Sequence, residues 1–171
     1  GVCVLDKTEN RNTQELLDAM QFSMQGIYEF AQIADLADVQ AVLERQIQCN
    51  TAIAEEGLAH SYGANIGSVL LSTYGDSVQI RARALAAAGS DARMSGCPMP
   101  VVINSGSGNQ GMTVSLPIIE YAKEYNISDE GLYRALVAGN LISLHQKKYI
   151  GSLSAYCGAV SAACGSGVGI A

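Results

Sequence analysis

The sequence of 171 residues has no tryptophan, three prolines and few charges. Only 15% of the residues are charged, whereas an average globular chain has about 25%. Because 49% are hydrophobic, the chain can bury a core, and this composition excludes an intrinsically disordered protein. The length predicts one domain covering residues 1–171.

Positive charge is scarce as well. The sequence has 10 Lys+Arg against 16 Asp+Glu, a net charge of -6, and its basic residues cluster only at Arg81 with Arg83 and at Lys147 with Lys148. It therefore predicts neither a nucleic-acid partner nor an anionic membrane surface. No apolar run reaches membrane-spanning length. Five widely spaced cysteines do not form a disulfide framework in a chain of this size, so we expect a reducing, cytoplasmic location.

Hydrophobic periodicity predicts a mainly α, compact helical domain with a Gly-rich active-site loop and little or no sheet. Asn12 and Glu15 have the spacing of a capping box, and apolar residues recur every three or four positions as far as Ala34. This pattern predicts one long helix, which would form an antiparallel pair with a second helix capped by Asp38. Further helices are predicted over residues 65–74, 77–88, 112–125 and 128–149, and from residue 154 onward.

The segment from Met94 to Gly111 contains a G-x-G-x-x-G pattern at Gly106, Gly108 and Gly111. It follows a predicted strand over residues 101–104 and precedes a predicted helix, as in a dinucleotide-binding unit. Such a unit needs a second parallel strand that ends near an acidic residue. Here Asp129 and Glu130 open a helix instead, so the dinucleotide interpretation is disfavoured.

The same glycines can turn backbone N–H groups toward one point, and the N-terminus of the following helix adds positive potential. A small carboxylate or phosphate is the natural ligand of such a loop. A polar turn without function is the simpler interpretation, but the density of donors favours a site. The candidate substrate-binding residues are Ser105, Gly106, Ser107, Gly108, Asn109, Gln110 and Gly111.

Cys157 and Cys164 share a helical face but would lie about 10.5 Å apart along an unbroken helix. This separation favours one of them as a metal ligand, not both, and Cys97 is the next candidate. Taken singly, each cysteine is expected to be a small buried hydrophobe. His60 and His145 are isolated, so no Ser-His-Asp or Cys-His arrangement is indicated, and the sequence identifies no general base.

Three ordered segments carry a family resemblance. They are Gly96-Cys-Pro-Met-Pro-Val, Ser105-Gly-Ser-Gly-Asn-Gln-Gly111 and Lys148-x-Ile-Gly-x-Leu-Ser-x-x-Cys-Gly158. In this order they resemble the serine dehydratase alpha-chain-like family, which includes L-cysteine desulfidase and iron-sulfur L-serine dehydratases. The likeness spans residues 91–171.

The resemblance implies a helical, cytoplasmic lyase with a 4Fe-4S cluster held by three cysteines, one iron remaining open. Its reaction is the β-elimination of L-cysteine to pyruvate, ammonia and sulfide, or of L-serine to pyruvate and ammonia, without pyridoxal phosphate. Cys157 matches the family's first cluster cysteine. The loop from Ser105 to Gly111 matches the glycine loop near the active site.

The sequence also departs from the family pattern. The other two cluster cysteines belong to a downstream Cys-Asp-Gly-Ala-Lys-type motif, which this chain does not contain, and an N-terminal Gly-Cys-Thr-Glu-Pro-type motif is missing. We therefore expect a central fragment of a longer enzyme that binds no intact cluster and does not catalyse alone. Its expected partners are an amino-acid substrate, the remaining segments of the parent chain and a second copy in a homo-oligomer. The alternative is a non-catalytic helical module that binds a small anion at the loop over residues 106–111.

Overall fold

The computed structural model describes residues 23–150 and 156–171. These residues form seven α-helices and one 3-10 turn, and no strand occurs among them. The elements are α2 (Met24–Ile33), η1 (Leu36–Asp38), α3 (Gln40–Ala59), α4 (Ile66–Tyr74), α5 (Val78–Met94), α6 (Gly108–Glu124), α7 (Asp129–Ile150) and α8 (Gly158–Ile170). The predicted mainly α fold class is confirmed.

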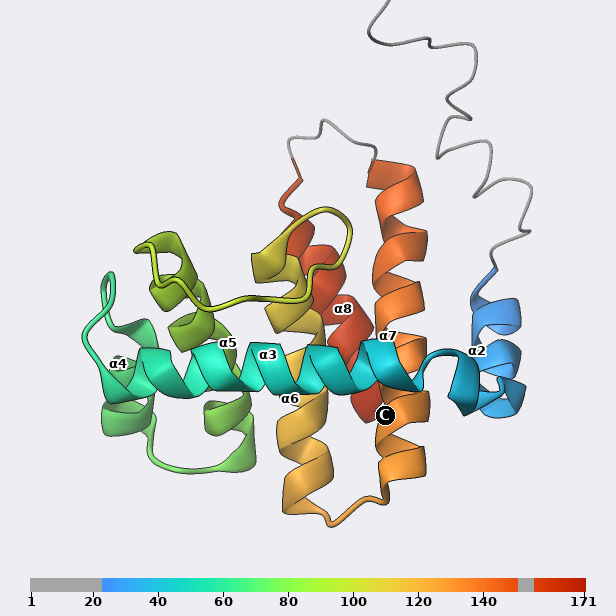
Figure 1. Cartoon of the computed structure of the whole chain (residues 1–171), viewed down its shortest axis with the longest axis horizontal. Coiled ribbons are helices and arrows are strands. Elements are labelled where there is room, and N and C mark those ends of the chain that lie inside the picture. The colour runs from blue at the N-terminus through green and yellow to red at the C-terminus, as the bar shows by residue number, and fades with distance from the viewer. Residues whose placement is uncertain (1–22, 151–155) are drawn as a thin grey trace, which may run out of the picture.

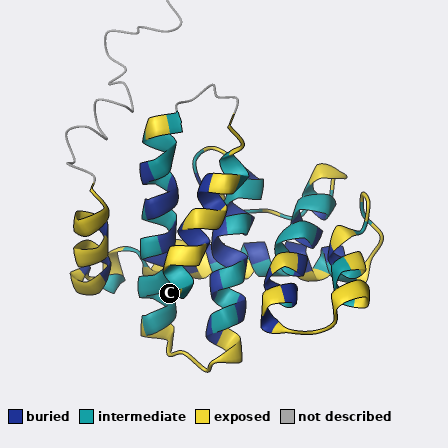
Figure 2. Ribbon diagram, turned by 180° about the vertical axis from the view of Figure 1, so that it is seen from behind, coloured by how far each residue is buried: buried dark blue, intermediate teal, exposed yellow. Residues whose placement is uncertain are grey.

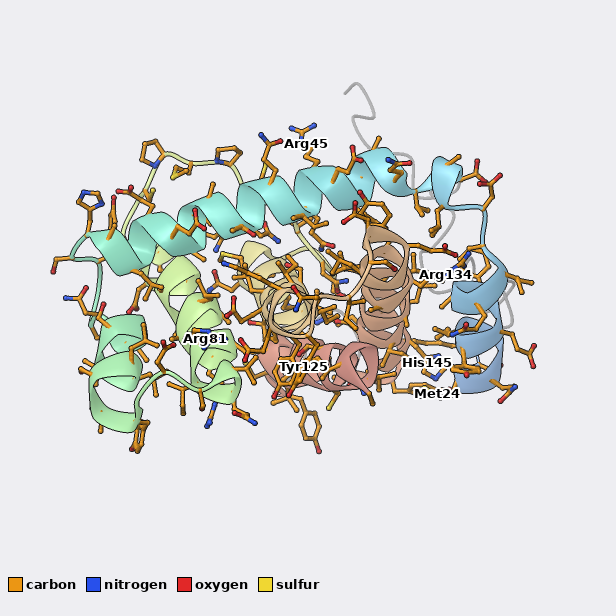
Figure 3. The ribbon with its side chains drawn as sticks, turned by 90° about the horizontal axis from the view of Figure 1, so that it is seen from below. Met24, Arg45, Arg81, Tyr125, Arg134 and His145 are labelled. Carbon is orange, nitrogen blue, oxygen red and sulfur yellow. The ribbon has the colours of Figure 1, made fainter. Side chains whose placement is uncertain are left out.

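The helices pack in three layers. The long helix α3 crosses one side of α5, α6 and α7, and α8 covers the other side of α6 and α7 (Figures 1 and 3). Helices α6 and α8 run in the same direction, with α7 antiparallel to both, so α6 and α8 begin at the same end of the molecule (Figure 1). None of the helices within the described ranges is long and apolar enough to cross a bilayer.

Two predictions for the N-terminal half are wrong. Helix α2 does not continue a helix from residue 12 without interruption, because Ser23 is extended (φ -118°, ψ 157°) and its Oγ accepts the Gly26 N–H at 3.0 Å. This side chain starts a new helix there; the predicted cap at Asn12 lies outside the described residues. Helix α2 also packs against α7, not as an antiparallel pair with α3, because η1 redirects the chain between them.

Helix α6 is the centre of the hydrophobic core. Its Met112 and Leu116 pack with Ile53 and Ala54 of α3, while its Ile118 belongs to a second cluster. That second cluster also contains Ala31, Leu43, Leu136 and Val137. Figure 2 shows the buried residues concentrated on α6 and its neighbours. Burial on nearly all sides fixes the position of α6, and therefore of its N-terminus.

Small residues allow α7 and α8 to approach closely. A Cβ added at Gly165 would collide with the Gly139 carbonyl oxygen, and one added at Gly139 would lie 3.1 Å from the Gly165 carbonyl oxygen. Helix α3 meets α5 in the same way, because a Cβ at Gly57 would collide with the Ala88 carbonyl. At these contacts there is no space for charged side chains between the helices, which contributes to the low charge of the sequence.

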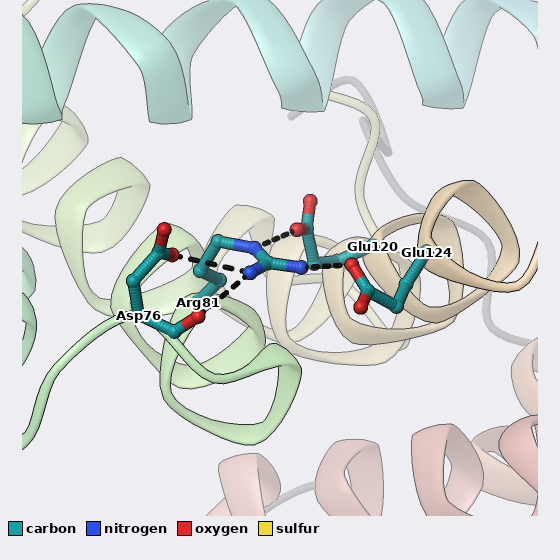
Figure 4. A network of polar contacts seen from close by, with 4 residues as sticks. All are labelled: Asp76, Arg81, Glu120 and Glu124. Carbon is teal, nitrogen blue, oxygen red and sulfur yellow. Dashed lines mark hydrogen bonds and ion pairs between the residues drawn. The ribbon is translucent and has the colours of Figure 1, made fainter.

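Polar contacts also join the helices. Arg81 of α5 binds Glu120 and Glu124 of α6 and Asp76 in the preceding loop (Figure 4). These carboxylates raise the pKa of Arg81 above its ordinary value. Arg134 reaches from α7 toward α2 (Figure 3), where its Nη1 donates to the Ala31 carbonyl at 3.0 Å.

The close contact between α7 and α8 can be tested by Gly165→Ala. We expect the free energy of unfolding of the 171-residue chain to fall by about 1–3 kcal/mol, because the methyl group has no space. Gly167→Ala is the matched control on the same helix, since no atom lies within 4 Å of the added carbon. The control should be stabilised by up to about 1 kcal/mol. Similar urea-denaturation midpoints for both variants would contradict this packing.

Candidate functional site

A tight turn stands at the centre of the predicted loop. Asn104 and Ser107 exchange two backbone hydrogen bonds of 3.1 and 3.0 Å, and the residues between them are left-handed, Ser105 at φ 51° and Gly106 at φ 82°. Two consecutive positive φ angles define a type I′ turn. The predicted strand over residues 101–104 is wrong, because it forms only an isolated bridge within the turn.

The absence of strands in the described ranges also removes the structural basis of the dinucleotide interpretation. A G-x-G-x-x-G site needs a parallel sheet that presents the loop at its edge. Here Gly106 lies in the turn, whereas Gly108 and Gly111 lie in the first turn of α6. The glycines therefore serve a turn followed by a helix, not a strand followed by a helix.

Asn50 of α3 anchors the chain just before this turn. Its Oδ1 accepts the Val102 N–H at 2.9 Å, and its Nδ2 donates to the Val102 carbonyl at 3.2 Å. The Nδ2 group also donates to the Ser115 Oγ of α6 at 3.1 Å. Asn50 is fully buried, so its amide replaces the hydrogen bonds that a neighbouring strand would provide.

Asn104 anchors the turn itself. Its Nδ2 donates to the Asn140 Oδ1 at 2.9 Å, and its Oδ1 accepts from the Ser143 Oγ at 3.0 Å and the Ser105 Oγ at 2.7 Å. Asn140 exchanges two further side-chain hydrogen bonds with Gln46 of α3. This buried network joins the turn to α3 and α7 and holds its shape.

The turn leads directly into α6. Ser107 is the N-cap residue, but its side chain makes no capping hydrogen bond. Among the described residues, no acceptor is present for the N–H groups of Gly108, Asn109 and Gln110. A helix N-terminus with free N–H groups attracts an anion. Gly111 is required here, because a Cβ would collide with the Val102 carbonyl.

The structure places the predicted metal ligand beside this loop. Cys157 is exposed and is the N-cap residue of α8, and the next residue, Gly158, contacts the side chain of Gln110 so closely that a Cβ would collide with its amide. The N-terminus of α8 thus adjoins that of α6, at the end where both helices begin (Figure 1). The two sites predicted separately from the sequence are neighbours.

Two buried polar atoms near this junction have no hydrogen-bond partner among the described residues. They are the Gln110 Oε1 and the Ser161 Oγ. Ser161 is 1% exposed and lies one helical turn after Cys157. An unpaired buried polar atom costs about 1–3 kcal/mol, and functional sites are among the places where such groups persist.

Arg93 is a residue that the sequence analysis missed. Its side chain contacts Gly108 so closely that a Cβ there would collide with it, and its Nη1 donates to the Asn109 Oδ1 at 3.1 Å. No carboxylate of the described residues pairs with it. The only sequence signal was a basic residue near the end of a helix, which is common at surfaces.

The described cysteines are not the fully buried hydrophobes that we expected. Cys157 and Cys164 are exposed, Cys49 and Cys97 are half-buried, and all four are free thiols. Cys97 packs beside Tyr62 against the α3–α5–α6 core. Hydrogen bonds with Glu56 and Cys97 raise the pKa of Tyr62 to about 12. Cys3 lies outside the described residues.

No group of three or more His, Cys, Asp or Glu residues within residues 23–150 and 156–171 could hold a metal ion. Cys157 is exposed and has no disulfide partner, and the residue after it, Gly158, contacts Gln110 at the start of α6. These residues can therefore supply one ligand to a metal centre and an anion-binding helix end next to it. Together they define a helical protein with an exposed cysteine beside the N-terminus of a buried helix.

Comparison with known proteins identifies the family. The family model for the serine dehydratase alpha chain matches residues 4–171, so the chain belongs to the serine dehydratase alpha chain family. It is 55% identical over 99% of its length to a UPF0597 protein of Lachnoclostridium phytofermentans, covering 41% of that protein. It is 60% identical over 91% of its length to a UPF0597 protein of Desulfitobacterium hafniense, covering 36% of that protein.

More distant relatives agree with this membership. A UPF0597 protein of Bacteroides thetaiotaomicron is 37% identical over 98% of this chain. The chain spans about two fifths of the length of the first two relatives. No solved structure matches it.

The anchoring role of Asn50 can be tested by Asn50→Ala. The substitution leaves both backbone groups of Val102 without their side-chain partner, and each unpaired group costs about 1–3 kcal/mol. We expect the chain to lose about 2–4 kcal/mol of unfolding free energy and the Val102 amide to exchange faster. Gln48→Ala, an exposed position on the same helix, should change stability by less than about 0.5 kcal/mol. Unchanged Val102 exchange in Asn50→Ala would contradict this role.

Proposed function

We propose that this chain is part of an iron-sulfur-dependent amino-acid lyase. The reaction is the β-elimination of L-cysteine to pyruvate, ammonia and sulfide, or of L-serine to pyruvate and ammonia. A single observation carries the proposal: the free N–H groups at the start of α6 and the exposed Cys157 at the start of α8 adjoin through Gln110 and Gly158. One binds a carboxylate and the other binds iron, which are the two requirements of this chemistry.

Cys157 fits a 4Fe-4S cluster as one of its ligands. Its thiol is exposed and free at the N-cap of α8, and cysteine sulfur is the usual protein ligand of such clusters. When bound, such a cluster supplies an open iron that polarises the leaving group on the β-carbon. The further ligands would come from the remaining polypeptide, because the described residues contain no group of three or more His, Cys, Asp or Glu that could hold a metal ion.

The residues of this chain would bind and orient the substrate. The free N–H groups at the start of α6 would hold its carboxylate, and the turn at Ser105 and Gly106 would fix the position of that helix end. The unpaired Gln110 Oε1 and Ser161 Oγ would gain hydrogen-bond partners when the site is complete. Ser107, whose hydroxyl does not cap α6, remains available to the substrate.

The remaining segments of the longer polypeptide would complete the enzyme, and the isolated chain would be inactive. Large apolar side chains are exposed on α2 and α8, including Ile33 at 80% and Val160 at 63%. Such surfaces favour contact with further polypeptide or with a second copy. Free thiols are typical of a reducing compartment, which supports a cytoplasmic location.

A non-catalytic module that binds a small anion is the second candidate. It is favoured by the single cysteine at the junction and by the absence of a three-ligand metal group within the described ranges. It requires only the start of α6 and no cluster. The two functions differ in whether Cys157 holds iron.

The iron-sulfur function can be tested by Cys157→Ala in the full-length enzyme, purified without oxygen. We expect the brown colour, the iron and sulfide content and the elimination of L-cysteine or L-serine all to be lost, because a cluster ligand is removed. Cys164→Ala is the matched control, an exposed cysteine on the same helix, and should keep its cluster. Unchanged iron content in Cys157→Ala would refute the ligand assignment and favour the anion-binding module.

A further inference from the structure

Arg93 differs from the other partly buried arginines in its partners. Arg81 contacts three carboxylates, and Arg134 pairs with Glu130 at 3.0 Å. Arg93 has neutral partners only, the Asn109 Oδ1 at 3.1 Å and the Met94 Sδ at 3.5 Å. A half-buried guanidinium keeps its charge at all physiological pH values. Its counter-ion is therefore missing from the described part of the chain.

The missing counter-ion matters more because of where Arg93 lies. Its side chain lies against Gly108, the first residue of α6. The N-terminus of a helix carries partial positive charge, so a cation there is unfavourable by itself. The same arrangement becomes favourable when an anion lies between the guanidinium and the free N–H groups.

We propose that Arg93 binds the α-carboxylate of the substrate, an inference that rests on the lyase function above and specifies its substrate class. The Asn109 side chain holds Nη1 and so orients the guanidinium. The remaining N–H groups of the planar fork can then bind a carboxylate through two hydrogen bonds. The site selects amino acids with a free α-carboxylate over their amides and over simple amino alcohols.

Helix geometry also assigns an orientation to the bound substrate. Gly108 and Gln110 lie about 200° apart around the axis of α6, at about 100° per residue. Arg93 contacts the first, and Gly158, beside Cys157, contacts the second. A substrate across the end of α6 therefore has its carboxylate toward Arg93 and its β-carbon toward Cys157. Elimination at a cluster held by Cys157 would require this orientation, because the leaving group is on the β-carbon.

The test compares L-serine with L-serinamide, which lacks the carboxylate. In the full-length enzyme, Arg93→Met should raise the KM for L-serine about 10- to 100-fold, the effect of losing a charge-assisted contact. The preference for L-serine over L-serinamide, measured as the ratio of their inhibition or Michaelis constants, should fall by the same factor. If Arg93 had a purely structural role, the substitution would weaken the binding of both compounds equally and leave the ratio of their constants unchanged.

Three further measurements sharpen the result. Arg93→Lys, which keeps the charge but not the fork, should lie between the wild type and Arg93→Met. Added guanidinium ion should partly rescue Arg93→Ala with L-serine. Arg83→Met is the matched control, because Arg83 is an exposed arginine on the same helix whose Nε donates to the Gln79 carbonyl, and both constants should be unchanged.

The outcomes separate this inference from the lyase proposal. If Cys157→Ala loses the cluster but Arg93→Met leaves the serine-to-serinamide ratio unchanged, the carboxylate assignment is overturned and the lyase proposal stands. If no cluster is found, titration of the 171-residue chain with L-serine and L-serinamide, followed by NMR at the amides of residues 108–110, still decides the assignment. Equal shifts with both compounds, or an L-serine titration midpoint that is unchanged in Arg93→Met, would refute it.

Discussion

The hydrogen bonds between the Asn50 side chain and the backbone of Val102 are the interaction on which the rest of the site depends. In a fold whose described part has no sheet, an irregular segment in the core must find partners for its N–H and C=O groups elsewhere. A fully buried amide on α3 provides both partners. The Asn50 side chain thereby fixes where the chain crosses α6 and where the Asn104–Ser107 turn begins.

The close packing of small residues determines the second half of the site. Gly139 and Gly165 bring α7 and α8 into contact, and Gly158 allows the Gln110 amide to reach the start of α8. The two helix N-termini are adjacent because of these contacts, and their positive ends act on the same region. Arg93 adds a full charge beside them. This end of the molecule therefore has a local cation and two helix N-termini in a protein whose net charge is -6.

Local interactions explain which elements could be predicted. The Ser128 side chain caps α7 as expected, with its Oγ accepting the Gly131 N–H at 3.2 Å, because such a cap involves residues three positions apart. The continuous first helix was wrong because its periodicity extends across Ser23, where a competing cap interrupts it. The strand prediction failed for a different reason. The backbone of Val102 in this segment pairs with the Asn50 side chain, 52 positions away, not with another strand.

The sequence by itself determined the helical class, most helix boundaries, the glycine turn and the family, since caps, periodicity and motifs are local properties of the chain. Only the tertiary structure decided that Gly158, next to Cys157, contacts Gln110, and that Arg93 contacts Gly108. These contacts join residues far apart in the sequence, and they exist because α5 and α8 both pack against the buried helix α6. Hydrophobic periodicity assigns a residue to one face of its own helix. Only the packing of the helices decides which residues of other helices that face contacts.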